Sequence, residues 1–136
     1  MSAIEITLIE GVQLEAKAPL ATNPIRTDLS KGMGGKGDDM SCTDLLAVSL
    51  GGCMLTMMGL LARKLNVDLK GAKAEVTKTM VLQPELKFTG FHVTISVPQA
   101  LDAGVQAQLE DAARHCPVHT AIRDDIKQDV TFQWGG

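Results

Sequence analysis

The amino-terminal part of the chain alternates apolar and polar residues, as a strand with one buried face does. The alternation covers residues 3–18 with a break at Gly11, which predicts a hairpin of two strands. A third, short strand is expected over residues 25–29. It leads into residues 31–40, where four glycines surround Lys36, and we expect a mobile loop there.

The pattern then changes to that of one long helix, expected over residues 43–65. Ser41 and Asp44 have the spacing of a capping box, with Asp in place of the usual Glu, and Asn66 is suited to end the helix. Between Asp44 and Arg63 lie eighteen uncharged residues, whose apolar side chains are spread around the whole helix. A helix that is apolar on all sides must be buried on all sides.

Two kinds of surroundings could bury this helix. Its uncharged run just reaches the length of a membrane span, but three glycines and two hydroxyl residues dilute it, so we favour a soluble protein. A chain of 136 residues has too few elements to enclose the helix, which predicts an obligate homodimer. Because a glycine inside a helix costs about 1 kcal/mol relative to alanine, Gly51 and Gly52 indicate a place where another backbone comes unusually close.

The second half of the chain mixes strands and helices. Its expected elements are a hairpin of strands over residues 70–82 and 87–97, a helix over 101–114, a short helix over 117–126, and a strand over 129–134. Because strands and helices do not alternate regularly, the fold class is α+β. The sequence contains no internal repeat, linker or low-complexity tract, which predicts one domain over residues 1–136.

Composition and charge argue against several functions. Only 3% of the residues are aromatic and none is tyrosine, so stacking on nucleic-acid bases is almost unavailable. The net charge is -3 and no stretch concentrates basic residues, so we expect no nucleic-acid partner. The acidic amino terminus lacks the features of a secretory signal, which predicts a cytoplasmic location without membrane association.

The glycine-rich residues 31–40 superficially resemble a phosphate-binding loop. However, Lys36 is followed by glycine and aspartate where such a loop needs serine or threonine. The carboxylates of Asp38 and Asp39 would also repel phosphate. We therefore assign no nucleotide cofactor to this loop.

Three cysteines in a reducing compartment indicate thiol chemistry, metal binding or packing. Taken alone, Cys53 in the apolar helix is expected to be a buried core thiol. Pro117 is favoured at the first helical position, which places Cys116 at an N-cap where N–H groups favour a thiolate. If partly exposed, Cys116 should react readily. The alternative is that it only caps a short helix, with His115 and His119 at the surface.

A metal site is a further possibility for the motif around Cys116. His115, Cys116 and His119 are all potential ligands. A fourth ligand is missing, and structural zinc usually uses two paired motifs separated by a loop. We therefore expect no metal here.

Two motifs together carry a resemblance to a known family. The sequence SCTDLLAVSLGGC ends at Cys53, and AARHCPV contains Cys116. With the glycine-rich loop and the order of elements, these motifs resemble the OsmC/Ohr family of osmotically inducible and organic-hydroperoxide-resistance proteins. The resemblance implies an intertwined α+β homodimer with antiparallel sheets packed around long central helices.

The resemblance also implies a reaction. In peroxidase members of that family, the cysteine matching Cys53 attacks the peroxide and becomes a sulfenic acid, and the cysteine matching Cys116 resolves it as a disulfide. An external dithiol reductant then restores both thiols. Apolar walls would suit organic hydroperoxides better than hydrogen peroxide. We therefore expect a thiol-dependent peroxidase of oxidative-stress defence.

The sequence departs from this family at other positions. Peroxidase members also supply an arginine and a glutamate that activate the thiolate, and the nearest residues here are Arg26 and Asp44. Nine residues separate Asp44 from Cys53, about 13 Å and half a turn along a straight helix, so capping is the expected role of Asp44. Arg26 could reach the thiol only through the fold or from a partner subunit. Cys42 stands where the family commonly has proline, and we assign it no role.

Two other functions stay open at this point. One is a non-enzymatic protein that binds a small hydrophobic molecule in a dimer cleft, with both cysteines structural. The other is a redox sensor that signals through disulfide formation without efficient turnover.

Overall fold

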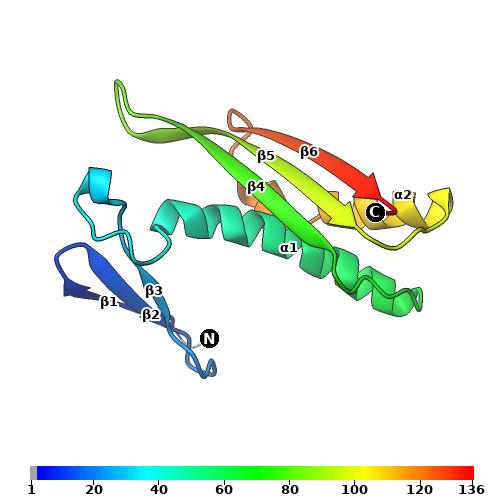
Figure 1. Ribbon diagram of the computed structural model, residues 1–136, viewed down its shortest axis with the longest axis horizontal. Coiled ribbons are helices and arrows are strands. Elements are labelled where there is room, and N and C mark those ends of the chain that lie inside the picture. The colour runs from blue at the N-terminus through cyan, green and yellow to red at the C-terminus, as the bar shows by residue number, and fades with distance from the viewer. Residues whose placement is uncertain (1–2) are drawn as a thin grey trace. The chain divides into compact units, whose positions relative to one another are not determined.

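The computed structural model describes residues 3–136, which form two three-stranded sheets and three α-helices (Figure 1). They divide into two compact units, one ending at Leu46 and the other running from Ala47 to Gly136. Each unit is described by itself below. The predicted α+β class is confirmed, whereas the prediction of a single domain over residues 1–136 stays a prediction.

The first unit is an antiparallel sheet with the strand order β1-β2-β3. The strands are β1 (Glu5–Glu10), β2 (Gln13–Lys17) and β3 (Ile25–Thr27). β1 and β2 pair as the hairpin that the alternation predicts. Gly11 lies in their turn with φ at 55°, a left-handed conformation that glycine adopts without a steric penalty.

One buried carboxylate organises the glycine-rich segment that follows β3. Asp28 is only 2% exposed and accepts four hydrogen bonds. Its donors are the N–H groups of Leu29 (2.8 Å), Lys36 (3.1 Å) and Asp38 (3.4 Å) and the side-chain amide of Gln13 (3.3 Å). Gly35 is required here because a Cβ would overlap the carbonyl oxygen of Leu29. The segment, which includes a short 3₁₀ turn over Lys31–Met33, therefore has a defined anchor that its glycines did not reveal.

Burial and hydrogen bonding act in opposite directions on this carboxylate. Burial raises the pKa of Asp28, because the charged form loses solvation. The four donors stabilise the charged form and lower the pKa further than burial raises it. The net result is a pKa below its ordinary value of 3.8.

The long helix α1 (Cys42–Lys64) begins and ends where its sequence signals predict. Ser41 and Asp44 form a reciprocal capping box, in which each backbone N–H donates to the other side chain at 3.0 Å. At the other end, Asn66 has a left-handed φ of 56°. The N–H of Val67 then donates to a carbonyl five residues back, at 2.8 Å, which closes the last turn.

The second unit contains a mixed sheet with the strand order β4-β5-β6. Its elements are β4 (Lys73–Val81), β5 (Lys87–Val97), α2 (Ala103–Arg114), α3 (Pro117–Ala121) and β6 (Lys127–Trp134). β4 and β5 form the predicted antiparallel hairpin. β6 runs parallel to β5, so the sheets are not antiparallel throughout as expected. The reason is the connection through α2 and α3, which returns the chain to the end of the sheet where β5 begins.

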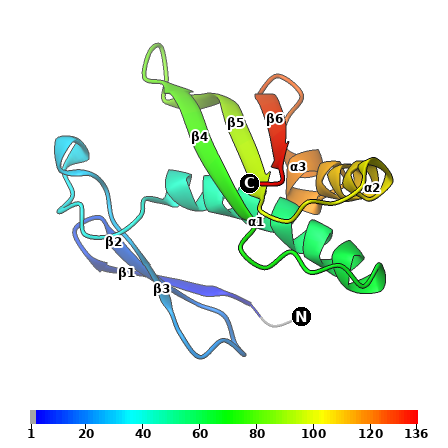
Figure 2. The same ribbon diagram turned by 45° about the vertical axis from the view of Figure 1, so that its right-hand side comes forward.

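The core of the second unit lies between its sheet and its helices, which Figures 1 and 2 show on one face of the sheet. Alternate residues of β5 face this side and are at most 2% exposed. They are Phe91, Val93, Ile95 and Val97. From α1 they meet a stripe at helical spacing, formed by Leu50, Met54 and Met58, each 0% exposed. Helix α2 adds Leu109, and the Trp134 indole on β6 donates to the Glu110 carboxylate at 3.0 Å.

Gly51 allows α1 to lie close to β4. A Cβ at Gly51 would be 2.7 Å from Cγ2 of Val76 and 3.2 Å from Cβ of Ala74. A close approach at Gly51 is therefore present, but the prediction that another backbone makes it is wrong, because the neighbouring atoms belong to side chains. A Cβ at Gly52 would meet no atom of residues 3–136 within 4 Å, so nothing in the described part of the chain explains Gly52.

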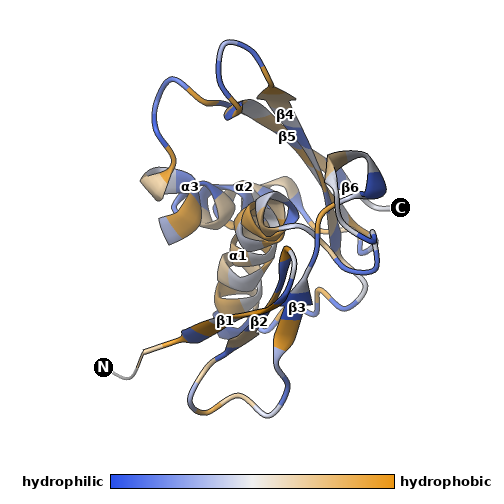
Figure 3. Cartoon of the chain, turned by 90° about the vertical axis from the view of Figure 1, so that its left-hand side faces the viewer, coloured by the Kyte–Doolittle hydropathy of each residue, from blue (hydrophilic) through white to orange (hydrophobic). Residues whose placement is uncertain are grey.

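The second unit leaves part of α1 exposed, in agreement with the expectation that this chain has too few elements to enclose the helix. Val48 and Leu60 on other faces are 50% and 43% exposed. The first unit also exposes apolar side chains, including Ile6 and Leu8 at 66% and 63%, and Figure 3 shows hydrophobic stretches on β1–β3 and along α1. By length and composition α1 could span a membrane, but core helices of soluble proteins meet the same test. A second copy as the cover stays a prediction.

The close contact of α1 with β4 gives a first testable prediction. Gly51→Ala should lower the free energy of unfolding by roughly 1–3 kcal/mol relative to the control Gly104→Ala, because Val76 and Ala74 leave no room for the methyl group. At Gly104 on α2 the nearest atom to a Cβ is 3.5 Å away, so that variant should be neutral or more stable. Urea unfolding of the variants measures both. Equal stability of the two would contradict the packing described here.

The depressed pKa of Asp28 gives a second prediction. Because the folded pKa lies below the unfolded one, this group stabilises the fold above about pH 4 and loses that contribution as pH falls through the folded value. Asp28→Asn should therefore lower stability at neutral pH and flatten the loss of stability in acid. The exposed Asp124→Asn is the control and should change neither. Urea midpoints measured from neutral to acidic pH test this, and an unchanged acid dependence in Asp28→Asn would refute it.

Candidate functional site

The fold brings two cysteines from distant parts of the second unit into contact. The side chain of Cys53 lies close enough to that of Cys116 to raise the pKa of the Cys116 thiol. Cys53 lies on α1, and Cys116 lies in the turn between α2 and α3. All three cysteines of the chain are free thiols in this structure. Two adjacent thiols are the arrangement from which a reversible disulfide can form.

Local structure holds each thiol in place. Cys53 lies at the margin of the buried stripe of α1, next in sequence to the fully buried Met54, and is half-buried. Cys116 is the N-cap of α3 and precedes Pro117 at the first helical position, as predicted. Its sulfur accepts a hydrogen bond from the N–H of His119 at 3.2 Å. Its own N–H donates to the carbonyl of Ala113, at 3.3 Å.

The exposures of the two thiols differ from what their sequence contexts indicate. Cys116, whose reactivity depended on partial exposure, is 0% exposed, whereas Cys53, expected in the core, is only half-buried. The physical reason is that Cys116 follows the last turn of α2, whose Ala113 is also 0% exposed. The thiol of Cys116 thus lies on the same buried side as Ala113 of α2. The N-cap position in the sequence does not indicate whether the thiol faces the core or the solvent.

Burial also reverses the expected acidity of Cys116. Loss of solvation raises the pKa of the Cys116 thiol above its ordinary value, and the hydrogen bond and charge of Cys53 raise it further. The N–H groups of His119 and Val118 oppose this rise without cancelling it. Cys116 therefore keeps its proton in the reduced protein and can donate it to the sulfur of Cys53.

The two histidines that flank Cys116 have different surroundings. The ring Nδ1 of His115 lies 2.8 Å from the carbonyl oxygen of Asp111 on the surface of α2. The ring Nδ1 of His119 instead bonds the side-chain oxygen of Gln128 on β6. Within residues 3–136 no three His, Cys, Asp or Glu side chains are placed to hold a metal. The rings of His115 and His119 thus have protein partners in place of a common metal.

Gln128 is a site residue that the sequence interpretation missed. The expected strand began at residue 129, but β6 begins at Lys127 because the chain becomes extended at Ile122, directly after α3. The alternation of apolar and polar residues along β6 could have indicated Gln128. Gln128, Val130, Phe132 and Trp134 are half-buried and alternate with exposed residues, so one glutamine occupies an otherwise apolar face.

The other predicted site residues lie in the first unit. Arg26 on β3 is exposed, and its Nε lies 3.6 Å from the Glu15 carboxylate on β2. Asp44 caps α1, as the sequence favoured. The exposed Cys42 donates a weak hydrogen bond from its thiol to the hydroxyl of Thr27 at 3.7 Å. Any role of Arg26 or Asp44 at the thiols stays a prediction.

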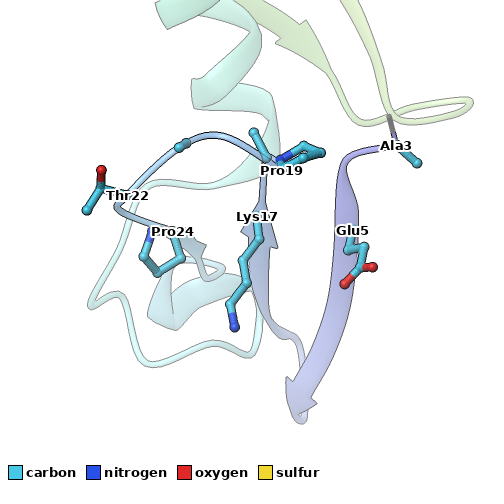
Figure 4. Close-up of a pocket in the computed structure, with 8 residues that line it drawn as sticks. Ala3, Glu5, Lys17, Pro19, Thr22 and Pro24 are labelled. Atoms are coloured by element: carbon cyan, nitrogen blue, oxygen red, sulfur yellow. The ribbon is translucent and has the colours of Figure 1, made fainter. Parts of the chain in front are cut away.

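A pocket of about 420 Å³ lies in the first unit, and neither Cys53 nor Cys116 lines it. Figure 4 shows Lys17 and Glu5 on neighbouring strands, with Pro19 and Pro24 in the connection between β2 and β3. Among the described residues that line it there is no cysteine or histidine. We therefore base the candidate site on the thiol pair.

Comparisons with known proteins agree on one family. A family model described as OsmC-like protein matches residues 35–131. A protein from Psychrobacter arcticus, assigned to osmotic stress and detoxification response, is similar over 98% of this chain and 96% of its own, with 37% identity and a TM-score of 0.91. An OsmC-like protein from Mycoplasma pneumoniae has 16% identity, coverage of 98% and 96%, and a TM-score of 0.82. The organic hydroperoxide resistance protein OhrB of Bacillus subtilis has 14% identity, coverage of 97% and 98%, and a TM-score of 0.66. No curated protein matched.

The burial of the thiols predicts an order of alkylation. With iodoacetamide at neutral pH, the exposed Cys42 and half-buried Cys53 should react first, and Cys116 roughly tenfold or more slowly, because it is inaccessible and its pKa is raised. Peptide mass spectrometry over time gives the three rates. Urea should abolish the difference, which controls for local sequence effects. Fast labelling of Cys116 in the native protein would contradict this placement.

Proposed function

The chain belongs to the OsmC-like protein family, and from this premise we propose that it is a thiol-dependent peroxidase that reduces organic hydroperoxides through Cys53 and Cys116. The observation that carries the proposal is the proximity of the two thiols, through which Cys53 raises the pKa of Cys116. A nucleophilic thiol needs a second thiol within reach if it is to be recycled through a disulfide. The chain supplies such a pair from two separate elements.

In the proposed first step, Cys53 is the nucleophile because it is the more accessible thiol of the pair. Its thiolate attacks the terminal peroxide oxygen, a sulfur–oxygen bond forms, and the oxygen–oxygen bond breaks. The peroxide is reduced to an alcohol after its alkoxide takes up a proton. Cys53 is oxidised to a sulfenic acid.

In the proposed second step, Cys116 resolves the sulfenic acid. Cys116 loses its proton and attacks the sulfur of Cys53, so that a disulfide forms and hydroxide leaves as water after protonation. A dithiol reductant from solution then exchanges with the disulfide and restores both thiols. Burial of Cys116 keeps this sulfur away from peroxide until Cys53 has reacted, which supports the division of roles.

The substrate class follows from the apolar surroundings and from the relatives. Met54 and Leu50 flank the thiol on α1, and further apolar side chains of the chain are left uncovered. Such walls favour an alkyl hydroperoxide over hydrogen peroxide. The Bacillus subtilis relative is named for organic hydroperoxide resistance. We accordingly assign this chain to oxidative-stress defence in the cytoplasm.

We further propose that the working form is a homodimer. The uncovered faces of α1 and of the β1–β3 sheet expose large apolar side chains, and a second copy would remove them from water. Such an assembly would complete the walls around the thiol pair. Arg26 and Asp44 are our candidates for the cation and the acid that orient the attacking thiolate, from the same or the partner subunit.

The proposal predicts the activities of three serine variants. Consumption of cumene hydroperoxide with a dithiol reductant should be lost in Cys53→Ser. In Cys116→Ser a single turnover should remain, with Cys53 accumulating as sulfenic and sulfinic acid, which mass spectrometry detects. Cys42→Ser is the matched control and should keep the wild-type rate.

Other results would favour the alternatives. Equal rates in wild type and Cys53→Ser would remove Cys53 from the mechanism. Retention of a hydrophobic ligand without turnover would favour a binding protein. Disulfide formation without repeated turnover would favour a redox sensor.

A further inference from the structure

A single polar side chain lies on the apolar face of β6. Gln128 shares that face with Val130, Phe132 and Trp134, and in the sheet it is paired with Phe91 of β5, which is 2% exposed. Placing an amide at such a position is unfavourable unless both of its ends are hydrogen-bonded. Both ends of the Gln128 amide are hydrogen-bonded, and both partners belong to His119.

The two hydrogen bonds of Gln128 define how His119 is held. The Nε2 of Gln128 donates to the carbonyl oxygen of His119 at 3.0 Å, and its Oε1 bonds Nδ1 of the His119 ring. Because the amide nitrogen of Gln128 donates to the carbonyl oxygen of His119, the atom of Gln128 that faces the His119 ring is Oε1, which can only accept. The ring must therefore donate from Nδ1, so the neutral ring is held in its Nδ1–H tautomer.

His119 is also the residue that contacts the buried thiol. Its backbone N–H donates to the sulfur of Cys116 at 3.2 Å. The helix that carries both residues, α3, has only five residues, and so short a helix has little stability of its own. Gln128 attaches this turn to the sheet at both the ring and the carbonyl of His119. These two bonds keep the peptide N–H of His119 directed at the sulfur of Cys116.

We propose that Gln128 is a positioning residue for the resolving step, acting through His119 to keep a peptide N–H directed at the sulfur of Cys116. This inference deepens the proposed function and rests on it. Cys116 attacks the sulfur of Cys53 and passes its proton to the hydroxyl group of the sulfenic acid, which leaves as water. Negative charge develops on the Cys116 sulfur during this step, before the disulfide bond is complete. A hydrogen bond to a charged acceptor is about twice as strong as one to a neutral acceptor, so a fixed N–H favours this step.

The first experiment measures the thiol without peroxide. In a Cys42→Ser, Cys53→Ser background Cys116 is the only thiol, and the thiolate can be followed by ultraviolet absorbance because the chain has no tyrosine. Gln128→Leu should reduce the thiolate fraction about tenfold at a pH below the titration midpoint, as expected for losing a hydrogen bond to a charged group. The control is Gln133→Leu, on the same strand but bonded to Ser96 on the outer face, and it should not change the titration.

The second experiment separates the two chemical steps in the wild-type thiol background. Gln128→Leu should slow disulfide formation after sulfenic acid formation about tenfold. The rate at which Cys53 becomes a sulfenic acid, measured with Cys116→Ser present, should be the same with either residue at position 128. A general loss of structure would slow both steps, so this difference distinguishes positioning from stability.

Two further measurements guard against a variant that folds poorly. Nitrogen NMR of the imidazole should show the Nδ1–H form of His119 in the wild type and its loss in Gln128→Leu. His119→Ala leaves the sheet intact, and its effect on the Cys116 titration should not add to that of Gln128→Leu, because both remove the same link.

The outcomes separate this inference from the proposed function. Identical titrations of Gln128→Leu and Gln133→Leu, or an Nε2–H form of His119 in the wild type, would overturn the role of Gln128. If the wild type fails to consume hydroperoxide, the proposed peroxidase function fails, while the titration still decides whether Gln128 positions the thiol.

Discussion

The packing of α1 on the β4–β5–β6 sheet is the constraint on which the candidate site depends. Gly51 lets the helix approach Val76 and Ala74 more closely than a Cβ would permit, and Cys53 follows two residues later on the same helix. The close contact at Gly51 therefore helps to fix the position of the helix segment that carries Cys53. Cys116 reaches Cys53 from a separate element, the turn between α2 and α3.

In the proposed mechanism, burial divides the work between the two thiols. Cys116 is fully enclosed and its raised pKa keeps it protonated, whereas Cys53 is partly open. A protected thiol that is reached only through its partner suits a resolving role, because it becomes a nucleophile only beside an oxidised Cys53. The N–H of His119 then offers a donor for the charge that appears on Cys116. Burial that would silence an isolated thiol therefore orders the two steps.

Local signals predicted most elements, and properties that depend on packing were the ones missed. The capping box at Ser41, the left-handed Asn66 and the N-cap at Cys116 involve only near neighbours, so the sequence indicates them directly. The exposure of Cys116 depends on how α2 meets the sheet, and the anchor at Asp28 depends on Gln13 from another strand. The parallel pairing of β6, and with it Gln128, similarly required the course of the α2–α3 connection.

The uncovered apolar surfaces bear on the chemistry as well as on assembly. For the proposed reaction, a thiol pair with one half-exposed member needs a wall that excludes water yet admits an alkyl group, and α1 and the sheet of the second unit supply one side of that wall. Large apolar side chains of α1 and of β1–β3 are exposed in the chain, and exposed apolar patches commonly mark interaction surfaces. A second copy that covers them would complete the wall, so assembly and substrate selection would follow from the same surface.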